Sequence, residues 1–221
     1  MRLILAIVGL LLLGACNMVV SKTPLFSKAD TAGLAQLRPG VWRETPKDPC
    51  DFDETTPFAA WPSCANGFVV NGGQVGGYDT DANGKKTWTS VELVVAGGEP
   101  RVMQVLMKDL GVKGLGELPF GPMYLYVAAH PTKSDAQGRI VAFSSWPILC
   151  GPPPPPDAKG PDGNSIRMGT LEPLPGLTMD KDGNNCTTTS QAVVQAAAKS
   201  SEQWRKPEDI TEDRWVRDGD R

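Results

Sequence analysis

Cysteine is the residue of this chain with the most specific chemistry, and its five copies fall into two groups. Cys16 directly follows an apolar stretch, Leu3–Leu13, and the small residues Gly14 and Ala15. The other four lie farther along the chain: Cys50, Cys64, Cys150 and Cys186. A cysteine sulfur acts as a nucleophile, a metal ligand or half of a disulfide, and its surroundings decide among these roles. The two groups therefore need separate interpretations.

The residues before Cys16 have the features of a secretory signal. One positive charge precedes an apolar stretch that is shorter than the roughly 20 residues needed to cross a membrane. Leu13-Gly14-Ala15-Cys16 resembles the lipobox of bacterial lipoproteins, whose cysteine is acylated and becomes the mature N-terminus. The resemblance implies lipidation at Cys16 and a membrane anchor made by its acyl chains. It also implies a periplasm-facing protein of the cell envelope, and Asn17 favours the outer membrane over the inner one.

The four remaining cysteines predict two disulfides, because the bacterial periplasm is oxidising. Three pairings are open, and we favour the local one, Cys50–Cys64 with Cys150–Cys186. The alternative is a zinc or redox site. No Cys-x-x-Cys motif occurs, and the single histidine, His130, has no partner near the cysteines. We therefore interpret the four cysteines as a structural framework.

Known catalytic motifs are missing from the sequence. It contains no Gly-x-Ser-x-Gly, His-Glu-x-x-His or Ser-x-x-Lys motif and no glycine-rich phosphate loop. His130 is a candidate general base. However, exposed histidines are common at strand ends, where the sequence places His130. Carboxylates are plentiful, and pairs of them are not recognisable from sequence. We predict that the protein is not an enzyme and has no cofactor, with a hydrolase using unrecognised carboxylates as an alternative.

Two acidic turns contain oxygen ligands of the kind that calcium prefers. Asp79, Asp81 and Asn83 match the first half of an EF-hand loop, but Ser90 stands where the final glutamate belongs. A hairpin turn explains these residues better, so they remain weak candidates and we predict no metal site. In the second turn, residues 180–185, helix capping and turn formation explain the same side chains.

The pattern of apolar residues predicts a mainly β domain. Asn83-Gly84 is the strongest hairpin signal, since both central residues of a type I′ turn need positive φ. Closely spaced strands without alternating helices favour an antiparallel sheet, a sandwich or a barrel. The expected strands are Val41–Thr45, Phe68–Val70, Gln74–Tyr78, Lys86–Val95, Arg101–Met107, Met123–Ala129, Arg139–Leu149, Ile166–Leu171 and Arg214–Arg217.

One helix is predicted near the C-terminus, where Thr188 and Gln191 match a capping box before residues 192–204. Val193, Ala197, Ser201 and Trp204 share one face of this helix. We expect the helix to lie across a sheet or to plug a barrel end. The expected organisation is a signal peptide over residues 1–15, a lipidated tether over 16–31 and a single disulfide-braced β-rich domain over 32–221.

Composition and one short motif bear on function. The formal net charge of −3 argues against a nucleic-acid partner. Gly40-x-Trp42 resembles the Gly-x-Trp signature of lipocalins, which implies a barrel around an apolar ligand. Otherwise Trp42 is a core or barrel-end residue. We predict a non-enzymatic accessory or interaction module of the envelope, whose protein partner is unidentified, with a lipocalin-like carrier as the alternative. An apolar cavity of roughly several hundred Å³ would favour the carrier.

Replacing Cys16 by serine is expected to abolish membrane association, because its acyl chains are the expected anchor. The measurement is the distribution of wild-type and Cys16→Ser protein between membrane and soluble fractions of the cells that express them. A serine variant that still sediments with membranes contradicts the lipoprotein interpretation.

Overall fold

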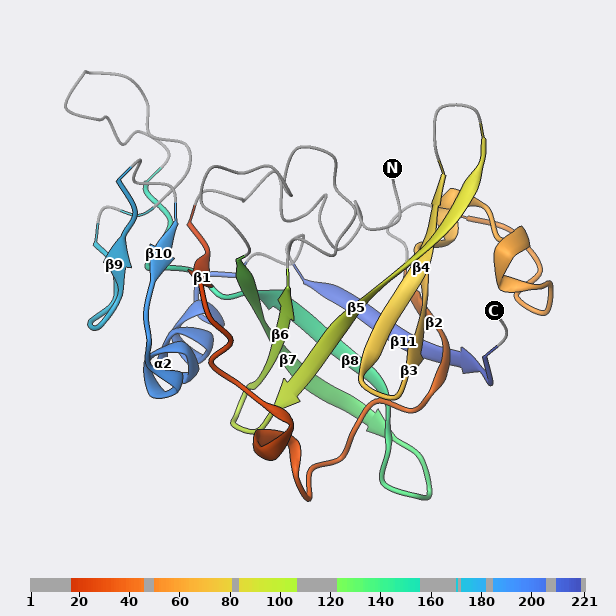
Figure 1. Cartoon of the computed structure of the whole chain (residues 1–221), viewed down its shortest axis with the longest axis horizontal. Helices are drawn as coiled ribbons and strands as arrows, with labels where there is room; N and C mark the ends of the chain where they lie inside the picture. The colour runs from red at the N-terminus through yellow and green to blue at the C-terminus, as the bar shows by residue number, and fades with distance from the viewer. Residues whose placement is uncertain are drawn as a thin grey trace.

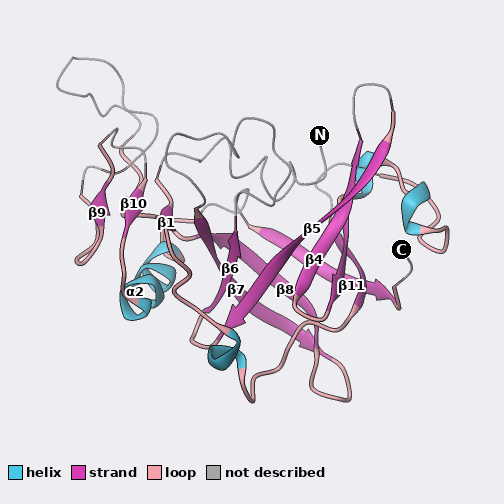
Figure 2. Cartoon of the chain, viewed as in Figure 1, coloured by secondary structure: helices cyan, strands magenta, loops and turns pink. Residues whose placement is uncertain are grey.

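The computed structural model describes residues 17–45, 50–80, 84–106, 123–155, 170, 172–181, 185–205 and 210–219. Its centre is an antiparallel barrel of eight strands (Figures 1 and 2). Seven of them are neighbours in chain order, and the eighth closes the ring. They are β2 (Gly40–Glu44), β3 (Gly67–Asn71), β4 (Gln74–Thr80), β5 (Lys86–Ala96), β6 (Arg101–Leu106), β7 (Tyr124–Ser134), β8 (Ile140–Pro147) and β11 (Thr211–Arg217). The mainly β prediction is confirmed, and the architecture is a barrel.

The barrel is closed by its last strand. β6 pairs with the next strand along the chain, β7, and β11, from the far end of the chain, lies between β8 and β2. β11 approaches the start of β2 so closely that a Cβ on Gly40 would lie 2.3 Å from the carbonyl oxygen of Arg217. Gly40 also has a φ of +134°, which side chains rarely adopt. The glycine of Gly-x-Trp is therefore required by closure of the barrel.

The strands of the barrel bury apolar side chains on both faces. Successive side chains point inward and outward in turn. Inward residues such as Val95, Met103 and Ala129 form a core inside the barrel. Their outward neighbours, including Val102 and Ala128, form a second core against the helix α2. A third core, on the outside of β2 and β3, is formed with the segment 50–65 and its short 3-10 turns η2 (Phe58–Ala60) and η3 (Ser63–Ala65).

The helix α2 (Gln191–Ser201) packs against the outer face of the barrel beside β6 and β7 (Figure 1). Its buried face consists of Val194, Ala197, Ala198 and Ser201. The expected N-cap, Thr188, is wrong, because the side chain of Ser190 accepts the hydrogen bond from the Val193 amide. The helix also ends before Trp204, which is half-buried in the following turn. The helix was expected either to lie across a sheet or to plug a barrel end, and it lies across the sheet that forms the barrel wall. Among the described residues, no helix is long and apolar enough to cross a membrane.

The N-terminal segment belongs to the folded body, so the prediction of a tether over residues 16–31 is wrong from residue 17 onward. Residues 17–21 are buried, and β1 (Val19–Ser21) pairs with β7 and with β10 (Cys186–Thr187). A buried glutamine, Gln104, then holds residues 25 and 26 through hydrogen bonds to their backbone amides. η1 (Lys28–Thr31) follows. The local pattern of apolar residues did not reveal this segment as a strand, because the strands with which it pairs are distant in sequence.

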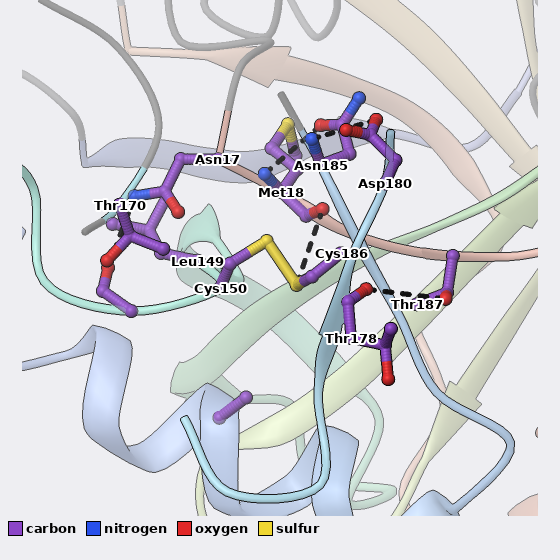
Figure 3. The surroundings of a disulfide bond; sticks show 12 residues. Asn17, Met18, Leu149, Cys150, Thr170, Thr178, Asp180, Asn185, Cys186 and Thr187 are labelled. Carbon is purple, nitrogen blue, oxygen red and sulfur yellow. Dashed lines mark hydrogen bonds between the residues drawn. A yellow bond between two sulfur atoms is a disulfide. The ribbon is translucent and has the colours of Figure 1, made fainter. Parts of the chain in front are cut away.

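Both predicted disulfides are present in the favoured pairing. Cys50–Cys64 and Cys150–Cys186 each join α-carbons 5.7 Å apart. The second bond ties the chain after β8 to β10, which forms a small hairpin with β9 (Thr178–Met179) (Figure 3). The amide of Cys186 donates to the Met18 carbonyl. This disulfide therefore fastens the hairpin beside the N-terminal strand β1.

Truncating Val194 to alanine is expected to lower the free energy of unfolding by about 2–3 kcal/mol, because it removes two buried methyl groups and leaves a cavity. Lys199→Ala, on the exposed face of the same helix, is the control and should change stability by less than about 0.5 kcal/mol. Chemical denaturation of the purified domain measures both. Equal stability of the two variants would show that α2 does not stabilise the barrel.

Candidate ligand pocket

A pocket with a volume of about 90 Å³ opens inside the barrel. Its walls are mostly apolar and come from β3 through β8, together with Leu37, which precedes β2. Three polar residues, all on β8 and β11, complete the lining: Ser145, Thr211 and Asp213. A concave apolar site with a few grouped polar side chains is the usual form of a small-molecule site. This pocket is therefore the candidate site of the protein.

The core beside the pocket is built around Trp42. The Trp42 side chain is fully buried, and its indole Nε1 donates to the Arg38 carbonyl at 2.8 Å. The rings of Phe68 and Phe143, which line the pocket, lie 6.0 and 5.5 Å from the Trp42 ring. The prediction of a core position for Trp42 is confirmed. The second half of Gly-x-Trp thus fixes the aromatic wall of the pocket.

Asp213 carries the unusual chemistry of the pocket. It stands on β11 opposite Phe143 of β8 and opposite Glu44 of β2. Asp213 is 6% exposed and Glu44 is 9% exposed. The Asn66 side chain donates to the Glu44 carboxylate at 3.1 Å. Within the described ranges, no hydrogen bond or ion pair reaches the Asp213 carboxyl.

These surroundings favour the neutral form of Asp213. Burial raises the pKa of its carboxyl well above the ordinary value of 3.8, and the negative charge of Glu44 raises that pKa further. In its protonated form this carboxyl can donate a hydrogen bond, and in its ionised form it can bind a cation. Asp213 is the single titratable group among the described residues that line the pocket.

The residues singled out from the sequence lie away from this pocket. Cys16 is outside the described residues, as are Asp81 and Asn83. Asp79 lies on β4 and accepts a hydrogen bond from the Thr89 hydroxyl at 3.2 Å. Asp180 belongs to the turn between β9 and β10, where its carboxylate accepts from the Asn185 amide. In the part of the chain that is described, no three His, Cys, Asp or Glu residues are grouped to hold a metal ion.

His130 also lies outside the pocket, and its expected position at a strand end is wrong, because β7 continues to Ser134. Its ring nitrogens lie 2.8 Å from a carboxylate oxygen of Glu99 and 3.1 Å from one of Glu202. The ring lies 5.0 Å from that of Trp146. His130 thus links the turn before β6 and the end of α2 to the barrel wall.

Sequence reasoning missed both Asp213 and Glu44, which are far apart in the chain and belong to no motif. The available signal was that each acid lies two positions from a tryptophan, and therefore on the same face of its strand. Glu44 has the same strand parity as Trp42, and Asp213 has that of Trp215. An acid at an inward position of a predicted strand marks a candidate site.

Comparison of the chain with protein-family models, curated proteins and solved structures found no match.

Asp213→Asn is expected to raise the melting temperature at pH 7 by a few °C and to flatten its pH dependence. Because the folded pKa is raised, the folded state holds the proton more tightly than the unfolded state. Asp213 therefore costs stability as pH rises above 3.8, up to its folded pKa. Asparagine keeps the shape without this cost. Thermal unfolding between pH 4 and pH 8 tests the expectation, and a variant less stable than the wild type at pH 7 contradicts it.

Proposed function

We propose that this protein is a non-enzymatic lipoprotein of the cell envelope whose barrel binds a small, mainly apolar ligand. The observation that carries the proposal is the apolar pocket inside the closed barrel, with its polar residues confined to β8 and β11. Anchoring through acyl chains on Cys16 rests on the lipobox resemblance. An accessory role follows, in which the anchored barrel holds its ligand beside the membrane. Asn17 favours the outer membrane over the inner one.

The volume of the pocket limits the size of the ligand. About 90 Å³ is smaller than the several hundred Å³ expected for a carrier of large apolar molecules. It exceeds the roughly 30 Å³ that one water occupies in the liquid, and it approaches the roughly 150 Å³ of an engineered cavity that binds benzene. The supported ligand is therefore one with few heavy atoms, and the proposal is narrower than a general lipocalin-like carrier.

The lining favours binding over hydrolysis. Carboxylate hydrolases place two acidic groups on either side of the bond that breaks. Among the described lining residues Asp213 is alone, since Glu44 does not line the pocket. A barrel with a completely filled core would favour a pure interaction module. The pocket inside this barrel favours ligand binding instead.

Benzene is expected to bind the wild-type protein, and Val105→Phe should weaken binding roughly tenfold or more by filling the pocket. Val105 pairs with Leu93 across β6 and β5, and both line the pocket. Glu92→Phe is the matched control, because Glu92 precedes Leu93 on the same strand but is exposed.

Ligand-detected NMR titration measures binding to all three proteins. No benzene binding by the wild type would refute the proposed pocket function. Equal weakening by Glu92→Phe and Val105→Phe would place the binding site elsewhere.

A further inference from the structure

The buried carboxyl of Asp213 has no partner within the protein as described. Such groups are rare in native interiors, because a buried polar group without a hydrogen bond costs free energy. The residue Asp213 is only 6% exposed, and it lines the pocket. A partner that enters the pocket would remove this cost. The position of Asp213 thus indicates where the polar group of a ligand lies.

Charged residues around Asp213 are arranged so that the interior is acidic. Glu44, its partner on β2, shares its face. The neighbouring pair, Arg43 of β2 and Arg214 of β11, points to the opposite face. There both guanidinium groups bind the carboxylate of Glu54. The cations closest in sequence are therefore engaged outside the barrel, and the pocket side keeps two acids.

Two hydroxyl groups stand on the same wall as Asp213. Thr211 precedes Asp213 by two positions on β11. Ser145 on β8 is the direct cross-strand partner of Thr211. Cross-strand partners have β-carbons about 5 Å apart, so the three side chains can reach one small polar group. From β8 no titratable side chain joins them, since Phe143 and Ser145 are the inward residues opposite β11. The wall offers three acceptors, which matches the three N–H donors of a primary ammonium group.

We propose that the pocket binds a small primary amine with an apolar body, and that Asp213 takes the ammonium group with Ser145 and Thr211. This inference rests on the proposed function, because it requires that the pocket take a ligand. The apolar body of the amine lies among Phe68, Leu93 and Met103, and Glu44 adds a second negative charge nearby. The negative charge of Glu44 disfavours an anionic ligand.

Binding of the amine requires loss of the Asp213 proton. When the ammonium ion enters, a protonated Asp213 carboxyl gives its proton to the buffer, and an ion pair with charge-assisted hydrogen bonds forms. The affinity for the amine therefore rises with pH up to the pKa of Asp213. The affinity for a neutral ligand of the same shape lacks this dependence.

The test compares n-butylamine with n-butanol, which has the same alkyl chain but carries no charge at pH 7. Calorimetric or NMR titration is performed on wild type, on Asp213→Asn and on Glu212→Gln. Glu212 is the exposed neighbour of Asp213 on β11 and serves as the matched control. We expect butylamine to bind wild type at least tenfold more tightly than butanol, which is about 1.4 kcal/mol.

Asp213→Asn should remove most of that preference and its pH dependence, while Glu212→Gln should leave both unchanged. Butanol binding as tightly as butylamine, or an unaltered preference in Asp213→Asn, overturns the amine proposal and leaves the pocket function standing. If butylamine, butanol and benzene all fail to bind wild type, the proposed function fails and the amine proposal with it.

Discussion

Closure of the barrel by β11 is the constraint on which the rest of the structure depends. Seven strands follow one another in chain order, and without β11 the strands β2 and β8 would each present an unpaired edge. β11 comes from the far C-terminal end of the chain and satisfies both edges. Its close approach at Gly40 leaves no room for a side chain there. The same strand carries Asp213 and Thr211 into the pocket, so closure and the candidate site are formed together.

The outer covers of the barrel explain why several strands are apolar on both faces. α2 and the N-terminal segment cover β5, β6 and β7, and the segment 50–65 covers β2 and β3. Cys50–Cys64 closes a loop within the segment 50–65, and Cys150–Cys186 lies before α2 in the chain. The bond Cys150–Cys186 joins the chain after β8 to the hairpin beside β1 (Figure 3). Both disulfides therefore brace the outer layers, and no cysteine among the described residues lines the pocket.

The distribution of charge across the barrel wall connects stability to the proposed function. Strand alternation places Arg43 and Arg214 outside with Glu54, and Glu44 and Asp213 inside. A buried acid without a partner lowers stability, and binding sites commonly retain such groups because a ligand satisfies them. An amine at Asp213 would supply the missing charge, in keeping with the proposed role.

Local features could be predicted from the sequence: most of the strands, the existence of the helix, and the presence of two disulfides, whose local pairing was favoured among three. The strands and the helix follow from the spacing of apolar residues and from turn residues, which are local features. The two disulfides follow from the number of cysteines. The folded arrangement was needed to show that residues 17–31 join the fold, that Ser190 caps α2, and that β11 closes a barrel. It also decided that Glu44 and Asp213 meet, because a strand pairing across 169 positions depends on backbone hydrogen bonds that leave no pattern in either segment.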